Sequence, residues 1–249
     1  MLEIKHAYKS FGEFKLKDID FQVKDGEYFV ILGPTGTGKT VILESIAGMY
    51  NLDKGNIYVD SINITRFSPE NRSIGFVYQD YLLFPHLSVR ENIAFGLKAR
   101  KLKKQEINEA LYEITEMLNI KHLLNRKINN LSGGEKQRIA FARAIIIKPK
   151  ILLLDEVSSA LDPKTKREFQ INLKKIHKKL HTTTIHVTHD FNEALYLADR
   201  IAVINNGEIC EIGTPEHIFN NPKTDFVASF VCGSNLKYGG EESETRQIL

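Results

Sequence analysis

The sequence predicts an α/β fold in which a mainly parallel sheet is joined by antiparallel strands from the N-terminus and by a helical insert. Residues 3–8 and 18–23 alternate polar and apolar side chains with period two, as half-buried antiparallel strands do. Short apolar runs then alternate with helical segments, which is the order that builds a parallel sheet. Residues 79–150 interrupt this alternation, because their apolar side chains recur at helical spacing.

Composition excludes several other classes of protein. Of the 249 residues, 42% are hydrophobic and 26% are charged, which is ordinary for a globular protein. No apolar run approaches the roughly 18 to 20 residues that cross a bilayer, and the N-terminus lacks the apolar block of a signal peptide. The net charge of +3 is too small to indicate nucleic acid, and the basic clusters at 98–104 and 174–179 lack interleaved aromatic residues. We therefore expect no nucleic-acid partner, and any role at a membrane requires another protein to hold the chain there.

The buried strands of the predicted sheet are short apolar runs. The first, residues 27–32, is apolar enough to be buried on both faces and leads directly into a glycine-rich turn. The later runs are 74–78, 151–154, 183–187 and 200–205. Asn206-Gly207 follows the last of them and predicts a type I′ hairpin with the next segment.

Helix-start signals divide the rest of the chain. Ser88 and Glu91 have the spacing of a capping box. Asp162-Pro163 supplies an N-cap and a proline at the first helical position. We expect one domain over residues 1–235, with a helical subdomain at about 79–150, and a polar C-terminal tail at 236–249.

A phosphate-binding motif follows the first buried strand. Its eight residues match G-x-x-x-x-G-K-[ST] completely and lie between a strand and a helix, as the motif requires. The glycines let backbone N–H groups turn inward to bind an anion, and the following helix adds its partial positive charge. Lys39 can reach the β- and γ-phosphates, and the Thr40 hydroxyl can ligate Mg²⁺. We expect ATP with Mg²⁺ at this P-loop, formed by Gly33, Pro34, Thr35, Gly36, Thr37, Gly38, Lys39 and Thr40.

Two carboxylates follow the strand at 151–154. Asp155 and Glu156 emerge at its carboxyl end, where ligands bind in open α/β sheets. Asp155 is the candidate to hold Mg²⁺, and Glu156 is the candidate general base that polarises the attacking water. His186 and His189 are three residues apart in a segment that begins as a strand, so we do not expect them to form a zinc site.

The segment 131–138, LSGGEKQR, resembles the signature of the ABC (ATP-binding cassette) ATPases. Residues 132–135 also read as a capping box that opens a helix, and the two interpretations are compatible. The resemblance implies a P-loop NTPase of the ABC cassette class, in which two copies of the chain sandwich two ATP molecules head to tail. It also implies that the signature faces the γ-phosphate of the partner copy through Ser132, Gly133, Gly134 and Glu135.

Further segments match the family in order. The resemblance implies that Phe11 stacks on adenine and that Gln79 links Mg²⁺ to the helical insert. It implies that Asp162 belongs to the loop joining the two active sites of the dimer, and that His189 contacts the γ-phosphate. The set expected to be catalytic is thus Glu156, His189, Lys39 and Gln79, and the set expected to ligate Mg²⁺ is Thr40, Gln79 and Asp155. Val157 departs from the proline usual in importers of this group, which leaves the carboxylates in place.

The segments 77–97 and 199–213 resemble ATPase subunits of anion and sugar importers, and most closely those of molybdate/tungstate importers. This implies an ATP-hydrolysing subunit, peripheral on the cytoplasmic face of the membrane, that powers import through a separate permease. An extracellular substrate-binding protein would be an indirect partner. The apolar segment 81–87 is either core or a groove for a helix of the membrane subunit, and we favour the groove. The alternatives are a cassette for sulfate, iron, sugar or polyamine import, a cassette for a separate exporter, or a non-transport ATPase on ribosomes or DNA.

Overall fold

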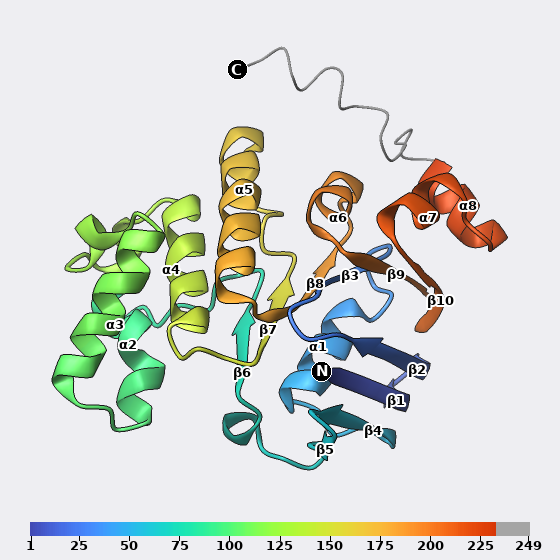
Figure 1. Ribbon diagram of the computed structural model, residues 1–249, viewed down its shortest axis with the longest axis horizontal. Helices are drawn as coiled ribbons and strands as arrows, with labels where there is room; N and C mark the ends of the chain where they lie inside the picture. The colour runs from blue at the N-terminus through green and yellow to red at the C-terminus, as the bar shows by residue number, and fades with distance from the viewer. Residues whose placement is uncertain (233–249) are drawn as a thin grey trace. The chain divides into compact units, whose positions relative to one another are not determined.

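The computed structural model describes residues 1–232, and the predicted tail at 236–249 lies outside them (Figure 1). The chain forms two compact units. Among the described residues, the first combines Met1–Arg72 with residues 180–232, and the second is Ser73–Lys179. The second unit includes the predicted helical subdomain together with strands and a helix on either side of it.

An antiparallel sheet opens the first unit. Its strand order is β2-β1-β4-β5, formed by β1 (Leu2–Phe11), β2 (Phe14–Val23), β4 (Lys54–Val59) and β5 (Ile62–Asn63). The predicted N-terminal strands are confirmed as β1 and β2, and both extend to ten residues. The sequence reading missed β4 and β5. A Cβ on Gly55 would lie 2.2 Å from the His6 carbonyl oxygen, so β4 approaches β1 closely at this glycine. Strand β4 therefore forms because it pairs with β1, and not because polar and apolar residues alternate along its own sequence.

The parallel part of the first unit is built on β3 (Tyr28–Leu32), all five residues of which are buried. It lies between β8 (Thr183–Thr188) and β9 (Arg200–Asn205) and is parallel to both. The hairpin from β9 to β10 (Glu208–Gly213) is antiparallel, with positive φ angles of 47° at Asn206 and 78° at Gly207. The predicted type I′ turn is therefore confirmed.

The helices of the first unit are short. They are α1 (Lys39–Ala47), α6 (Phe191–Leu197), α7 (Pro215–Asn220) and α8 (Asp225–Cys232), with a 3₁₀ turn, η1 (Pro69–Asn71). Helix α1 packs on β8, α6 on β3, and α7 and α8 on β10. The α1 helix ends at Gly48, whose φ of 86° is the left-handed conformation typical of a helix C-cap.

The second unit combines two parallel strands with helices. Strands β6 (Ile74–Val77) and β7 (Ile151–Asp155) pair in parallel. The helices are α2 (Val89–Ala99), α3 (Lys104–Met117), α4 (Gly133–Ile145) and α5 (Pro163–Leu180), with 3₁₀ turns η2 (Lys121–Leu123) and η3 (Ile128–Asn130). Helix α2 packs on both α3 and α4. Within residues 1–232, no helix combines the length and the apolar character needed to cross a membrane.

The predicted helix starts are confirmed. The Ser88 hydroxyl accepts a hydrogen bond from the Glu91 N–H at 3.3 Å, and the Glu91 carboxylate accepts one from the Ser88 N–H at 2.9 Å. The Asp162 carboxylate accepts a hydrogen bond from the Thr165 N–H at 3.1 Å, which caps α5. These contacts satisfy N–H groups that the first turn of a helix leaves without a backbone partner.

Candidate nucleotide-binding site

The P-loop joins β3 to α1. Gly36 and Gly38 have φ angles of 83° and 98°, a conformation that other residues rarely adopt. A Cβ on Gly33 would lie 2.4 Å from the Ile204 carbonyl oxygen, so no side chain fits there. The loop can keep this path only with glycine at these positions.

Lys39 folds back across the loop. Its ammonium donates hydrogen bonds to the carbonyl oxygens of Gly33 at 2.9 Å and Pro34 at 2.8 Å, and the residue is 5% exposed. The Thr37 hydroxyl donates to the same Pro34 carbonyl at 2.9 Å. The positive charge is thus held inside the turn that would surround a phosphate group, and the residues at the loop's tip, Thr35 and Gly36, are exposed.

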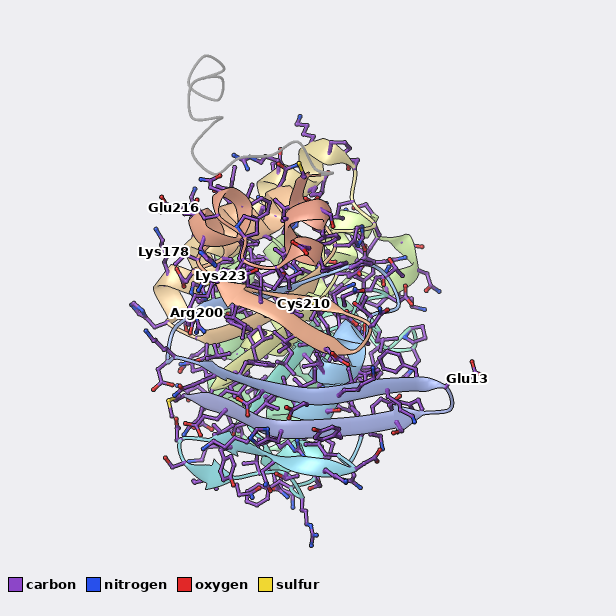
Figure 2. All side chains as sticks on the ribbon, turned by 90° about the vertical axis from the view of Figure 1, so that its right-hand side faces the viewer. Glu13, Lys178, Arg200, Cys210, Glu216 and Lys223 are labelled. Atoms are coloured by element: carbon purple, nitrogen blue, oxygen red, sulfur yellow. The ribbon has the colours of Figure 1, made fainter. Side chains whose placement is uncertain are left out.

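The β1–β2 hairpin lies against the P-loop. A Cβ on Gly38 would lie 2.4 Å from Cζ of Phe14, and Phe14 pairs with Phe11 across the hairpin turn. Glu13 marks the tip of this hairpin in Figure 2. The fold therefore brings Phe11, which the resemblance assigns to adenine, to the hairpin end next to the phosphate loop.

His189 follows β8 at the same edge of the sheet. Because Leu32 pairs with Thr188, the residues after them, Gly33 and His189, leave adjacent parallel strands at their carboxyl ends. His189 is exposed. The first unit therefore contains Phe11, the P-loop and His189.

A buried polar cluster supports this edge, and the sequence reading missed it. The Tyr28 hydroxyl lies 3.0 Å from Nδ1 of His186, and the Thr188 hydroxyl donates to the Glu193 carboxylate at 2.8 Å. Burial, followed by the nearby Glu193 charge, raises the pKa of Tyr28 well above its usual value. The signal was present in the sequence, because residues 183–188 carry polar side chains in a strand that is buried throughout.

The second unit contains the carboxylates and Gln79. Val77 pairs with Leu154, so the chain segments carrying Gln79 and Asp155 leave parallel strands at the same edge. Asp155 is buried, while Gln79 is exposed. Glu156 has a φ of 44°, and its carbonyl accepts a hydrogen bond from the Ser159 hydroxyl at 2.8 Å.

Val157 lies between the carboxylates and the loop that ends at Asp162. Its side chain is 2% exposed, so this valine packs in the core. Asp162 is exposed, and the hydrogen bonds from the side chain and the backbone N–H of Thr165 lower its pKa.

The signature begins α4. The Ser132 hydroxyl accepts from the Glu135 N–H at 3.3 Å, and the Glu135 carboxylate accepts from the Ser132 N–H at 2.7 Å. The latter bond is the main cause of a lowered pKa at Glu135. A Cβ on Gly134 would lie 2.9 Å from Cγ2 of Thr165, whereas Ser132 and Gly133 are exposed. The helix start therefore presents its N–H groups at the surface, as an anion site requires.

The expected Mg²⁺ ligands are all oxygen donors: the Thr40 hydroxyl, the Gln79 amide and the Asp155 carboxylate. Oxygen ligands are the chemistry that Mg²⁺ prefers, and this cation usually takes few of them from the protein and the rest from phosphate and water. Within the described chain no group of three or more His, Cys, Asp or Glu side chains could hold a metal ion by itself. The donor set fits a cation bound together with a nucleotide.

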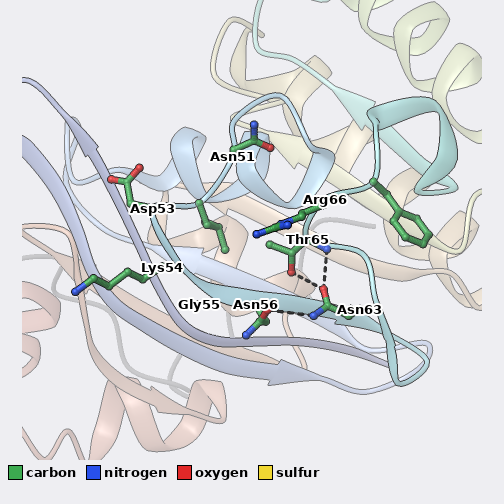
Figure 3. A pocket seen from close by; sticks show the side chains of 10 residues that line it. Asn51, Asp53, Lys54, Gly55, Asn56, Asn63, Thr65 and Arg66 are labelled. Atoms are coloured by element: carbon green, nitrogen blue, oxygen red, sulfur yellow. Dashed lines mark hydrogen bonds between the residues drawn. The ribbon is translucent and has the colours of Figure 1, made fainter.

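A surface hollow of about 790 Å³ lies along β4, and none of the P-loop residues lines it (Figure 3). Its wall is part polar and part apolar: the Asn63 amide donates to Asn56 at 3.1 Å, its oxygen accepts from the Thr65 hydroxyl at 2.6 Å, and Leu52 and Phe67 also line it. Asp53, which follows Tyr50 by three residues, is among the residues that line this hollow.

The apolar segment 81–87 lies in the second unit, and none of its residues is fully buried. Leu82 is 54% exposed, and the ring of Phe84 lies 4.6 Å from that of Phe95, which is itself exposed. The sequence left open that this segment is part of the core, but the exposure of Leu82 does not fit a core position. Its use as a docking groove remains a prediction.

The chain is similar to known ATP-binding cassettes over most of its length. Residues 16–159 match the ABC transporter family. The chain is 47% identical to the molybdate/tungstate import ATP-binding protein of Pyrococcus abyssi, covering 96% of this chain and 70% of that protein. It is 44% identical to the spermidine/putrescine import ATP-binding protein of Borreliella afzelii, covering 98% and 71%. Identity is 43% to the sulfate/thiosulfate import ATP-binding protein of Nocardia farcinica, covering 93% and 70%.

A solved structure agrees in fold. A dimeric ATP-binding cassette in a post-hydrolysis state, bound to ADP and phosphate, superposes with a TM-score of 0.77 and 31% identity, covering 86% of this chain and 99% of that one. The predicted fold class is confirmed: an antiparallel N-terminal sheet with a mainly parallel sheet and helices, the ABC cassette form of the P-loop NTPases. The chain belongs to the ABC transporter family, as its ATP-binding, ATP-hydrolysing subunit.

Proposed function

We propose that this chain powers import of an oxyanion, molybdate or tungstate, as a homodimer at the cytoplasmic face of the membrane beside separate permease subunits. The observation that supports molybdate or tungstate is the 47% identity to a molybdate/tungstate import protein. Polyamine and sulfate import are the alternatives, because relatives named for them are 44% and 43% identical. An extracellular binding protein would select the cargo.

Within this proposal the first unit holds the nucleotide. The adenine stacks on Phe11, and the phosphates lie in the P-loop. Lys39 exchanges the carbonyl oxygens of Gly33 and Pro34 for β- and γ-phosphate oxygens. Thr40, Gln79 and Asp155 would hold Mg²⁺, which would neutralise phosphate charge.

In hydrolysis, water bonds to the γ-phosphorus, the bond from this phosphorus to the bridging oxygen breaks, and ADP leaves; the step needs a base and a contact to the γ-phosphate. Glu156 accepts the proton of the attacking water, and His189 donates a hydrogen bond to the γ-phosphate. The exposed start of α4, at Ser132 and Gly133, binds the γ-phosphate held by the other copy. Each site is complete only in the dimer, so ATP binding favours closure and phosphate release favours opening. Asp162 lies in the loop that connects the two sites.

Motion reaches the permease through the segment that follows Gln79. Leu82 and Phe95 expose apolar surface next to Phe84, and an amphipathic helix of a membrane subunit is the kind of partner that such a surface accommodates. Gln79 would help to hold Mg²⁺ at the nucleotide and directly precedes the docking segment in the chain, so this residue would link the two.

The test is a capture experiment with a slow-hydrolysing variant. The tagged Glu156→Gln variant is expressed in the native host organism and is recovered from detergent-solubilised membranes in the presence of ATP and Mg²⁺. Glu168→Gln, which changes an exposed glutamate of α5, is the matched control. We expect a polytopic membrane protein to be enriched with Glu156→Gln. The binding protein that accompanies this permease is then titrated with molybdate, tungstate, sulfate and spermidine.

Two results would overturn the proposal. Ribosomal or DNA-associated partners in place of a permease would assign the ATPase to a non-transport role. A binding protein that prefers sulfate or spermidine would keep the importer and replace its cargo.

A further inference from the structure

Two half-exposed aromatic rings meet at the end of the β1–β2 hairpin. Phe11 is 37% exposed and Tyr50, just after α1, is 36% exposed. Their ring centroids lie 4.7 Å apart with an angle of 70° between the planes. The two rings are nearly perpendicular and both reach the surface, so Phe11 and Tyr50 form two walls of a surface corner, called the aromatic corner below.

A charged pair holds the Phe11 side of this corner. The Lys9 ammonium lies 5.1 Å from the centre of the Phe11 ring and 3.3 Å from the Asp53 carboxylate. Asp53 also accepts a hydrogen bond from the Ser10 N–H at 2.8 Å, and this bond is the main cause of its lowered pKa. Asp53 therefore carries its charge at neutral pH.

The same residue fixes Tyr50 relative to β1. Asp53 lies three residues after Tyr50 in the chain. Its N–H donates a hydrogen bond to the Tyr8 carbonyl oxygen of β1 at 2.8 Å. Asp53 thus ties strand β1 to the segment after α1 through both Tyr8 and Ser10. The aromatic corner is preformed, and a ligand that enters it does not have to order it.

We propose that Tyr50 is a second nucleobase-contacting residue, so that the adenine stacked on Phe11 also meets the Tyr50 ring. This rests on the proposed role of Phe11. A base parallel to Phe11 lies at about 70° to Tyr50, which is the edge-to-face arrangement that aromatic rings favour. The Tyr50 hydroxyl makes no hydrogen bond with any of residues 1–232, so it can face the base or solvent.

The role of Tyr50 is separable from phosphate binding. ATP and inorganic tripolyphosphate share the phosphate chain, but only ATP has a base. Isothermal titration of the full chain with both ligands therefore isolates the contribution of the base. The variants are Tyr50→Leu, which removes the ring, and Tyr50→Phe, which keeps it. Tyr112→Leu removes an exposed tyrosine from α3 and is the control.

We expect Tyr50→Leu to weaken ATP binding about five- to tenfold, near the low end of base–aromatic contacts, and to leave tripolyphosphate binding unchanged. Tyr50→Phe should stay within about threefold of the parent chain because the ring remains. Equal losses for ATP and tripolyphosphate would show that Tyr50 only supports the fold. An unchanged ATP affinity would remove Tyr50 from the base site.

A Phe11→Leu variant distinguishes failure of this inference from failure of its premise. If Phe11→Leu weakens ATP alone and Tyr50→Leu has no effect, only the role of Tyr50 is wrong. If Phe11→Leu also has no effect, the base does not bind at this hairpin. The chain contains no tryptophan, so Phe11→Trp adds a single tryptophan, which can be excited selectively above the absorption of the tyrosines. Its emission should change with ATP and not with tripolyphosphate, and the ATP midpoint should rise when Tyr50→Leu is added.

Discussion

Arg143 of α4 donates a hydrogen bond to the Tyr81 carbonyl oxygen at 2.9 Å. It donates a second to the Leu82 carbonyl at 2.8 Å, and its guanidinium lies 5.2 Å from the centre of the Phe84 ring. Tyr81 and Leu82 have positive φ angles of 62° and 41°, which non-glycine residues adopt at a cost in energy. One side chain of the signature helix therefore holds the segment that follows Gln79 in a strained conformation.

Replacing Arg143 should loosen this segment. Arg143→Ala removes two charge-assisted hydrogen bonds, and we expect the free energy of unfolding to fall by about 2–4 kcal/mol. Arg143→Lys should recover part of that loss, because an ammonium cannot serve both carbonyls with the geometry of a guanidinium. Urea unfolding measures both. Arg90→Ala, at an exposed arginine of α2, is the control. If Arg143→Ala lowers the free energy of unfolding no more than Arg90→Ala does, Arg143 does not hold this segment.

Gln137 should be destabilising where it stands. It is 0% exposed, and neither atom of its amide has a hydrogen-bond partner among the described residues. It shares a face of α4 with Phe141, whose ring lies 6.1 Å from that of Phe169 on α5. Buried amide groups without partners cost about 1–3 kcal/mol, so Gln137→Met, which keeps the length, should raise the free energy of unfolding by a similar amount.

Thermal and urea unfolding test this, with Gln105→Met on the exposed face of α3 as the control. A lower stability for Gln137→Met would show that the amide has partners that stabilise it. If the variant is more stable but hydrolyses ATP more slowly, the amide is retained for activity rather than for the fold.

Glu211 should make the stability of the C-terminal helices depend on pH. Its carboxylate accepts hydrogen bonds from the Lys223 N–H at 3.0 Å and the Thr224 N–H at 3.3 Å, and lies 2.6 Å from Nε2 of His217. Burial by itself raises the pKa of Glu211, but these contacts outweigh burial and hold the pKa below its usual value. The Lys223 side of this contact is marked in Figure 2.

The sign follows from the lowered pKa. The folded state favours the charged form, so the stabilisation is fully present above the ordinary pKa and is lost as pH falls through the folded-state value. Glu211→Gln should therefore lower the melting temperature at pH 7, and the difference from the parent chain should shrink below about pH 4.5. Glu216→Gln, at an exposed position of α7, is the control. A gap that is constant with pH would mean that Glu211 acts through packing and not through its charge.

Lys39 should be needed for tight nucleotide binding. Its ammonium lies within the P-loop, and loss of charge-assisted bonds to phosphate is worth about 1.5–3 kcal/mol, or roughly 10- to 150-fold in the dissociation constant. Lys39→Ala should weaken ATP and tripolyphosphate alike, in contrast to changes at Phe11 or Tyr50. Lys54→Ala, at an exposed lysine of the same unit, is the control. Unchanged ATP affinity in Lys39→Ala would refute the P-loop assignment.

Local chemistry explains which elements could be predicted from the sequence. The P-loop, the Ser88 and Ser132 capping boxes and the Asn206-Gly207 turn each depend on a few adjacent residues, so their patterns are visible in the chain. Strand β4 depends instead on pairing with β1, and it begins with Lys54-Gly55-Asn56, which gives no strand signal.

The contacts between residues far apart in the chain, near the candidate site, could not be predicted from local patterns. Arg143 and Tyr81 are 62 residues apart, and Phe11 meets Tyr50 only after β1 has paired with β4. Family resemblance identified Phe11 and Gln79, because they lie in recognisable motifs. It gave no information about Tyr50 or Lys9, whose roles appear only when the strands are placed.

The most direct test of the ATP-dependent homodimer is the mass of Glu156→Gln in solution. Sedimentation of this variant with saturating ATP and Mg²⁺ should give about twice the 28.4 kDa of one chain, because each signature would close the P-loop site of the other copy. With ADP the same protein should sediment at the mass of one chain. A monomer in saturating ATP, with ATP shown to be bound, would contradict the paired site and the mechanism built on it.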